Sequence, residues 1–233
     1  MDDPAKHRIQ TYSESKNSIF YRFIKKTILE AREKFFYYFE NSTEYNDNKS
    51  LLDIGTTPSL DSEQNIILEK TKNNKNITCL SDQDCRILEK KYQNIKSFVI
   101  GDGLRTDYKD MTFDIVHSNA TIEHVGSLES QIAFIQEASR VAKKYVFIQT
   151  PNRFYPIDFH TNLPLIHWLP KKIHRKILKF IGLSFYSLEE NLNLLSEKNL
   201  IDICTKLELK NFRIIKHRLF FMTSNLILVI KKS

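Results

Sequence analysis

The sequence predicts a doubly wound α/β fold, in which a seven-stranded, mostly parallel sheet carries helices on both faces. Three observations predict it. Apolar runs of strand length alternate with amphipathic helical patterns through the middle of the chain. Polar turn residues separate these segments. Near the end, two apolar runs are joined by the short link Met222–Thr223, which is too short for a crossover, so the last strand must run antiparallel.

Length and composition place the chain among ordinary globular proteins. It has 233 residues, of which 41% are hydrophobic and 27% are charged, enough for a full core in one domain. Its three cysteines have no paired metal spacing and predict neither a disulfide framework nor a zinc site, so a reducing cytoplasm fits best. The polar start and the strand-sized apolar runs predict neither export nor a membrane span.

The formal net charge of +7 has two interpretations. It could mark an anionic partner, such as nucleic acid, a phosphorylated substrate or lipid headgroups. It could also follow from a lysine-rich composition bias, which the presence of only five glycines supports. We favour the bias.

The first expected element is an amphipathic helix over residues 18–40, followed by a polar linker. Residues 1–48 therefore form an amino-terminal helix and linker, and residues 49–233 form the main domain. The apolar positions at helical spacing are Phe20, Phe23, Ile24, Thr27, Ala31 and Phe35. In the main domain, five strands alternate with three helices. The strands are LLDI, NITCL, SFVI, FDIVHS and YVFIQT, and the helices are DSEQNIILEKTK, DQDCRILEKKY and LESQIAFIQEASRVAKK.

An insertion at about residues 151–186 is expected to lie over the edge of the sheet. Its proline-rich first part shows no strand or helix period, and KKIHRKILKF then forms a basic amphipathic helix. We expect the apolar face of this helix, with Ile173, Ile177, Phe180 and Ile181, to pack on the insertion. Its basic face is either a solvated surface, as is usual, or a contact with an anionic membrane. A helix over LNLLSEKNLIDICTKLEL precedes the final strands, FRIIKHRLFF and SNLILVIKKS.

Polar residues end three successive strands, where a doubly wound sheet binds its ligand. Asp53 ends the first strand, Ser81 and Asp82 the second, and Asp102 the third, with Gly103 keeping the backbone close. A turn-capping role is equally expected for Asp53 or Asp102 alone. Their convergence at one edge favours a ligand.

The turn GTTPS after the first strand has a single glycine, Gly55, and Pro58 removes a donor. A dinucleotide pyrophosphate needs a closer backbone approach than one glycine gives. A nucleoside-like ligand without phosphates needs only room beside Gly55 and the hydroxyls of Thr56 and Thr57. The turn therefore favours such a ligand.

These segments resemble the class I S-adenosylmethionine-dependent methyltransferases, in particular the group that includes ubiquinone-biosynthesis-type enzymes. The resemblance covers about Leu51 to Pro170 and rests on LLDIG, GDGLRTDYKDMTFDIVHSNATIEHV and YVFIQTPNR. It implies a Rossmann-like fold and S-adenosyl-L-methionine as cofactor. The segment TPNRFYPIDFHTNLPLIHWLP also resembles an insertion in bacterial members associated with surface-glycan gene sets.

The resemblance also implies which positions contact the cofactor. The first motif would touch the methionine part, an acid at Ser81 or Asp82 the ribose hydroxyls, Asp102 the adenine amine, and Asn119 and Ala120 the region beside the sulfonium. The first-motif positions are Asp53, Gly55, Thr56 and Thr57. The chain departs from the family pattern where Thr57 and Ser59 replace glycines and Ser81 replaces an acid.

Two histidines are candidates for the chemistry. If the acceptor is a hydroxyl, His124 is the expected general base, with Glu123 either as its orienting partner or as a contact of the methionine amine. An inert helix cap is an equally open role for His124. His160, in the insertion, is the reserve candidate. His160, His167 and His174 recur every seven residues, but prolines between them break a helix, so no metal site is predicted.

The leading hypothesis is a methyltransferase that acts on a small-molecule or glycan-type acceptor, by O-methylation. A non-catalytic scaffold with weakened cofactor binding is the first alternative. A nucleic-acid methyltransferase is the second, and it is disfavoured because no NPPY-like or paired-cysteine motif follows the fourth strand. The sequence predicts no oligomeric state.

Overall fold

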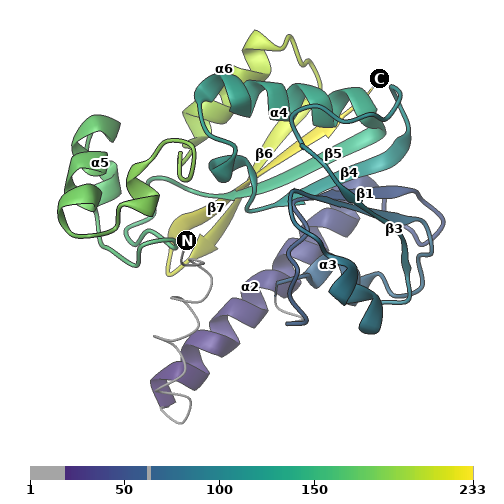
Figure 1. Ribbon diagram of the computed structural model, residues 1–233, viewed down its shortest axis with the longest axis horizontal. Coiled ribbons are helices and arrows are strands. Elements are labelled where there is room, and N and C mark those ends of the chain that lie inside the picture. The colour runs from purple at the N-terminus through teal and green to yellow at the C-terminus, as the bar shows by residue number, and fades with distance from the viewer. Residues whose placement is uncertain (1–18, 62–63, 233) are drawn as a thin grey trace.

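The sheet of the computed structural model, which describes residues 19–61 and 64–232, is doubly wound. Within that part of the chain, its seven strands lie in the order β3-β2-β1-β4-β5-β7-β6 (Figure 1). Only β7 runs antiparallel to its neighbours, β5 and β6. The strands are β1 Leu51–Ile54, β2 Ile77–Ser81, β3 Ile95–Ile100, β4 Phe113–Asn119, β5 Ala142–Pro151, β6 Phe212–Leu219 and β7 Met222–Lys231. The predicted fold class is confirmed.

Helices cover both faces of this sheet, each over its own apolar core (Figure 1). Helices α4, Leu128–Val141, and α6, Glu197–Lys206, lie on one face. Helices α2, Ile19–Thr43, and α3, Ile66–Lys70, lie on the other. The burial of alternate strand residues on opposite faces explains the two cores. Strand order reverses between β1 and β4, so the ligand site is expected at their carboxyl ends.

The amino-terminal helix α2 is a structural part of the domain. Its residue Phe39 is 1% exposed and packs edge-on against Phe147 of β5. The helix continues to Thr43, whose hydroxyl donates to the carbonyl of Phe39, so the polar linker is shorter than predicted. The side chains of Phe20, Phe23 and Ile24 lie outside the described part of the chain.

The first two crossovers are less helical than predicted. The helix expected over residues 61–72 is the single turn α3, and that over residues 82–92 is a 3-10 helix, Arg86–Lys90. The Asn65 side chain donates to the carbonyls of Thr57 and Ser59, which fixes the turn after β1 against the start of α3. An asparagine that bonds to backbone in this way competes with helix formation.

The carboxyl-terminal elements also differ in their boundaries. Helix α6 begins five residues later than its predicted pattern, at Glu197, because Ser196 and Asn199 form a capping box there. The hairpin turn is at Phe220 and Phe221, both in the left-handed region, rather than at Met222–Thr223. Because Leu219 pairs with Met222, the residues Met222 and Thr223 belong to β7.

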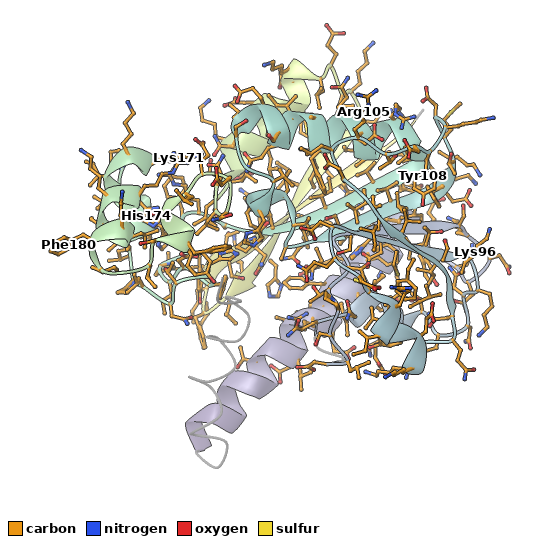
Figure 2. All side chains as sticks on the ribbon, in the orientation of Figure 1. Lys96, Arg105, Tyr108, Lys171, His174 and Phe180 are labelled. Carbon is orange, nitrogen blue, oxygen red and sulfur yellow. The ribbon has the colours of Figure 1, made fainter. Side chains whose placement is uncertain are left out.

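The predicted orientation of the basic helix is wrong. Helix α5, Lys171–Phe180, buries His174 and Leu178 against the rest of the insertion. Ile173 and Phe180 are instead 48% and 91% exposed. Figure 2 shows Phe180 projecting from the outer edge of the molecule. None of the helices in residues 19–61 and 64–232 combines the length and apolarity needed to cross a bilayer.

Candidate active site

Gly55 is the one glycine that the turn after β1 requires. Its φ is 88°, and a Cβ atom there would lie 2.0 Å from Oγ1 of Thr121. The Gly55 amide donates to the carbonyl of Leu80 at 2.8 Å, which ties the turn to β2. Positive φ and the close approach of Thr121 both exclude a side chain. Ala120, beside Thr121, also has a positive φ of 52°, which is uncommon for a non-glycine residue.

Asp53 lies at the carboxyl end of β1, next to a histidine that the sequence analysis did not single out. Its Oδ1 accepts from Nδ1 of His117 at 2.7 Å, and its Oδ2 accepts from the Thr56 hydroxyl at 2.7 Å. The His117 ring stacks on Phe147. Asp53 is 5% exposed. Parallel pairing of Asp53 with His117 was the available signal, because strand-end residues of neighbouring strands meet.

A cavity of about 640 Å³ lies at the carboxyl ends of the first three strands. Most of the predicted cofactor positions line it. These are Gly55, Thr56, Thr57, Ser81, Asp82, Asp102, Gly103 and Ala120, and His124 also lines it. Asp102 uses one carboxylate oxygen to accept from the Leu104 amide at 2.8 Å, so it caps its own turn. We call this space the first cavity.

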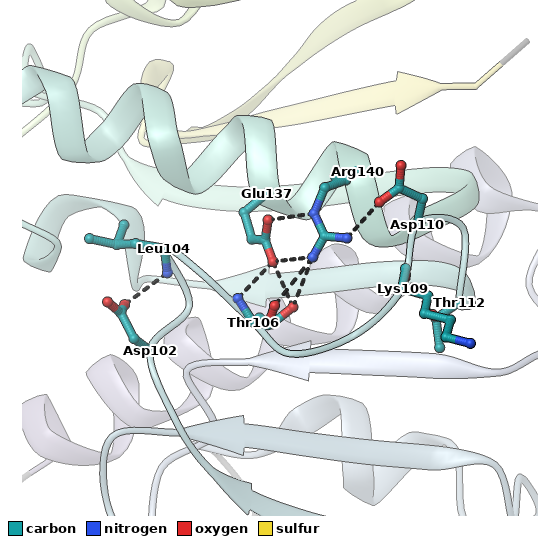
Figure 3. Close-up of polar contacts among 8 residues, drawn as sticks. All are labelled: Asp102, Leu104, Thr106, Lys109, Asp110, Thr112, Glu137 and Arg140. Atoms are coloured by element: carbon teal, nitrogen blue, oxygen red, sulfur yellow. Dashed lines mark hydrogen bonds and ion pairs between the residues drawn. The ribbon is translucent and has the colours of Figure 1, made fainter.

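The loop that carries Asp102 is tied to α4 by a charged network (Figure 3). Oε1 of Glu137 accepts from the amide and the hydroxyl of Thr106 at 2.7 and 2.6 Å. Arg140 donates to Glu137 and to Asp110. Burial alone would raise the pKa of Glu137, but the Arg140 and Thr106 hydrogen bonds lower it to about 2. The loop is therefore fixed by an ionised carboxylate.

A second cavity of about 590 Å³ adjoins the first. Both cavities are lined by the Gly55–Thr57 turn, by Ala120 and by His124. Asp53 and Asn119 line only the second, together with Arg32 of α2. Its far wall comes from the insertion and the segment after it, through His160, Phe185, Tyr186, Glu190 and Asn191.

The two candidate histidines meet at the wall of this second cavity. Nε2 of His124 lies 3.1 Å from Nε2 of His160. Nδ1 of His124 is 2.7 Å from the carbonyl oxygen of Asn191, and Nδ1 of His160 is 3.1 Å from Oδ1 of Asp158. His124 is therefore not the cap of α4, a role that Ser127 fills through its hydrogen bond with the Ser130 amide.

Glu123 lies behind these histidines, with 0% exposure. Its Oε2 accepts from the Thr150 hydroxyl at 2.9 Å, and its Oε1 is 3.6 Å from Nε2 of His160. The structure thus places it beside His160 and lining neither cavity, although the sequence suggested a contact with the cofactor's methionine amine.

The carboxylates of Glu123 and Asp158 set the charge of His160. Burial alone would lower the pKa of His160, but Asp158 and Glu123 raise it to about 9, so the ring is protonated near neutral pH. Burial would likewise raise the pKa of Glu123, but the two histidines hold it below its ordinary value.

Comparisons with known proteins agree with the fold. Residues 60–148 match a family described as a methyltransferase domain. The match begins just after the glycine-poor turn. The chain matches no curated protein sequence.

Solved structures of methyltransferases have a similar fold. A methyltransferase dependent on S-adenosylmethionine from Methanosarcina mazei has a TM-score of 0.54 at 16% identity, over 83% of this chain and 96% of that one. Magnesium protoporphyrin IX methyltransferase from Synechocystis, with bound S-adenosylhomocysteine, has a TM-score of 0.55 at 14% identity, over 96% of this chain and 91% of that one. A Burkholderia thailandensis 1,6-didemethyltoxoflavin N1-methyltransferase has a TM-score of 0.54 at 10% identity, over 100% of this chain and 92% of that one.

The fold and the matched domain define the class I S-adenosylmethionine-dependent methyltransferases. The chain has the fold of this class, and the domain match over residues 60–148 supports methyltransferase activity with S-adenosylmethionine as cofactor.

Proposed function

We propose that the enzyme O-methylates a small-molecule or glycan-type acceptor. S-adenosylmethionine would occupy the first cavity, and the acceptor hydroxyl would enter the second. The shared lining of the two cavities carries this proposal, because the turn Gly55–Thr57, Ala120 and His124 border both spaces. A methyl group at this boundary faces an acceptor without crossing protein.

The second cavity has the polar and aromatic lining that suits a hydroxylated acceptor. Asn119 and Glu190 offer hydrogen-bond partners, and Tyr186 and Phe185 offer ring faces. Methyl transfer from a sulfonium is an in-line displacement, so holding the hydroxyl against the methyl carbon supplies much of the acceleration.

The expected base role needs revision in this arrangement. The Asn191 carbonyl only accepts, so Nδ1 of His124 carries a hydrogen, and Nε2 of His124 faces the protonated His160. Nε2 of His124 therefore already accepts a hydrogen bond from His160, and His160 has no lone pair to offer. We propose that the histidine pair orients the acceptor hydroxyl, because neither ring has a free lone pair with which to take its proton.

Isotope transfer tests the acceptor chemistry. The enzyme is incubated with methyl-labelled S-adenosylmethionine and with matched phenol, sugar and amine acceptors, and mass spectrometry locates the methyl group. We expect label on oxygen. Transfer to nitrogen alone, by an enzyme that binds S-adenosylhomocysteine normally, would show that O-methylation is wrong.

We also propose that the outer face of α5 contacts an anionic membrane. Ile173, Phe180 and Ile181 are exposed beside the exposed Lys172, Lys176 and Lys179, which combines insertion of apolar groups with charge attraction. Vesicles with anionic lipid should sediment the protein at low salt but not at high salt. Changing the three lysines to glutamine should weaken binding by about 1 kcal/mol per lysine. Absence of binding at low salt would rule out this contact.

A further inference from the structure

Glu123, His124 and His160 direct three potential metal-ligand atoms toward one point at the wall of the second cavity. Nε2 of His124, Nε2 of His160 and a carboxylate oxygen of Glu123 all lie within 4.8 Å of one another. The two nitrogens are 3.1 Å apart, and the His160 nitrogen is 3.6 Å from Oε1 of Glu123. Two bonds of 2.0–2.1 Å at a tetrahedral zinc place neighbouring ligand atoms about 3.3 Å apart. Both measured distances are close to that separation.

The far side of each imidazole is already held by an acceptor. Asn191 offers a backbone carbonyl to Nδ1 of His124, and Asp158 offers a carboxylate to Nδ1 of His160. Both Nδ1 atoms therefore carry hydrogen. The two Nε2 atoms face each other, and the cation between them is either the second proton of His160 or a metal ion that displaces that proton. Metal-bound histidines are typically oriented in this way, by a carboxylate or carbonyl on the other nitrogen.

Glu123 supplies an independent observation. Its side chain has 0% exposure, and Oε2 is anchored by the Thr150 hydroxyl. Oε1, the atom nearer His160, is buried and accepts no hydrogen bond from any residue in the described part of the chain. Buried carboxylate oxygens are normally hydrogen-bonded. Oε1 has only the 3.6 Å contact with Nε2 of His160, so it keeps a lone pair for a cation between the two imidazole nitrogens.

We propose that Nε2 of His124, Nε2 of His160 and Oε1 of Glu123 bind a divalent transition-metal ion of the Zn²⁺ type. Two imidazoles and one carboxylate are a ligand set that suits such ions, and three protein ligands leave a position for substrate. Because His124 and His160 line the second cavity, the open position faces the acceptor space. A sequence search misses this site, since His124 and His160 are 36 residues apart.

The metal would help to deprotonate the acceptor hydroxyl before methyl transfer. This role rests on the proposed O-methylation. A hydroxyl oxygen bound at the open position loses its proton to water more readily, because the cation stabilises the oxyanion. The oxyanion then forms a bond to the methyl carbon while the carbon–sulfur bond breaks. The bonding electrons stay on sulfur, which leaves neutral S-adenosylhomocysteine and the methyl ether.

Calorimetric titration with ZnCl₂ tests the site in the full chain after metal has been removed with a chelator. We expect one Zn²⁺ per chain. Glu123→Gln and His160→Asn should each raise the dissociation constant at least ~100-fold, since each removes a ligand. Asp158→Asn should raise it about 10-fold, because Asp158 only orients His160, and loss of such outer partners typically costs 10–100-fold. Co²⁺ absorption should lose its ligand-field bands in the first two variants.

Glu190→Gln is the matched control. Glu190 is an exposed carboxylate on the same cavity wall but outside the cluster, so this variant should bind Zn²⁺ as the wild type does. Thermal melts of every variant show whether a lost site reflects a lost fold.

Two results would overturn the metal site. One is no stoichiometric binding of Zn²⁺, Mn²⁺ or Co²⁺ by the folded wild type, and the other is unchanged binding by both Glu123→Gln and His160→Asn. Either would assign a shared proton to the histidine pair. Titration with S-adenosylhomocysteine separates the two proposals: cofactor binding without metal binding overturns only the metal site. Metal binding without methyl transfer to oxygen supports the site and counts against O-methylation.

Discussion

The two cavities are built in different ways. The first lies in loops that follow directly from parallel strands, and its shape is held by backbone geometry at Gly55 and by the anchored loop at Asp102. The second is closed by the insertion, and its chemistry depends on side chains that meet across 36 residues, His124 and His160. A sheet fixes where its strand ends lie, whereas an insertion has no such rule. The proposed cofactor side therefore follows from the fold, and the proposed acceptor side is where enzymes of one fold can differ.

The largest expected effect is at Gly55, where the first cavity depends on backbone. Gly55→Ala should destabilise the protein by at least about 3 kcal/mol and abolish S-adenosylhomocysteine binding, because φ is 88° and the new Cβ would lie 2.0 Å from Thr121 Oγ1. Denaturant unfolding and calorimetry measure the two effects.

Gly182, just after α5, is the matched control for this change. Its φ is 85°, but a Cβ there meets nothing within 4 Å, so Gly182→Ala should cost only about 1–2 kcal/mol of backbone strain. Equal losses at the two glycines would show that Thr121 does not shape the cavity.

Glu137 tests whether the first cavity also needs its charged anchor. Glu137→Gln should lower the free energy of unfolding by about 2–3 kcal/mol at pH 7, because charge-assisted hydrogen bonds to Arg140 and Thr106 are lost. The pKa of Glu137 is lowered to about 2, so its stabilisation is present above its unfolded pKa of about 4.5 and is lost as pH falls through about 2. The gap between wild type and variant should shrink from pH 5 downward.

Unfolding curves at pH 7, 4 and 3 measure this gap. Glu129→Gln, an exposed change in the first turn of the same helix, should lower the free energy of unfolding much less than Glu137→Gln does. A gap for Glu137→Gln that stays constant down to pH 3 would mean that the carboxylate charge is not what fixes the loop.

The sequence predicted the doubly wound fold, the antiparallel final strand and the clustering of Gly55, Ser81 and Asp102 because each follows from local patterns plus the rules of parallel sheets. It missed the Asp53–His117 pair, which needs the register of β1 against β4. It also missed the pairing of His124 with His160, which needs the path of the insertion. Helix α5 was misoriented because its polar His174 is buried while the large apolar Phe180 is exposed, which reverses what hydropathy predicts.

Two substitutions at Asp102 separate the contribution of its charge to cofactor binding from that of its hydrogen bond to the Leu104 amide. Asp102→Ala should weaken S-adenosylhomocysteine binding about 10-fold, because it removes both the proposed adenine contact and the cap on the Leu104 amide. Asp102→Asn keeps an oxygen that can accept from that amide. If the carboxylate charge contacts the adenine amine, calorimetry should show that Asp102→Asn loses nearly as much S-adenosylhomocysteine affinity as Asp102→Ala. Wild-type affinity in both folded variants would remove Asp102 from the cofactor site.

The smallest expected effect is at Thr57, where the family pattern has a glycine. Thr57 does not have a positive φ, its carbonyl accepts from Asn65 and its side chain is exposed between the two cavities. The turn therefore does not need glycine's freedom here, and Thr57→Gly should change S-adenosylhomocysteine affinity by less than about twofold. Stability should fall by about 0.5–1 kcal/mol, because glycine loses more conformational freedom on folding. Calorimetry and thermal melts measure both quantities, and a tenfold loss of affinity with the fold intact would instead show that the Thr57 hydroxyl contacts the cofactor.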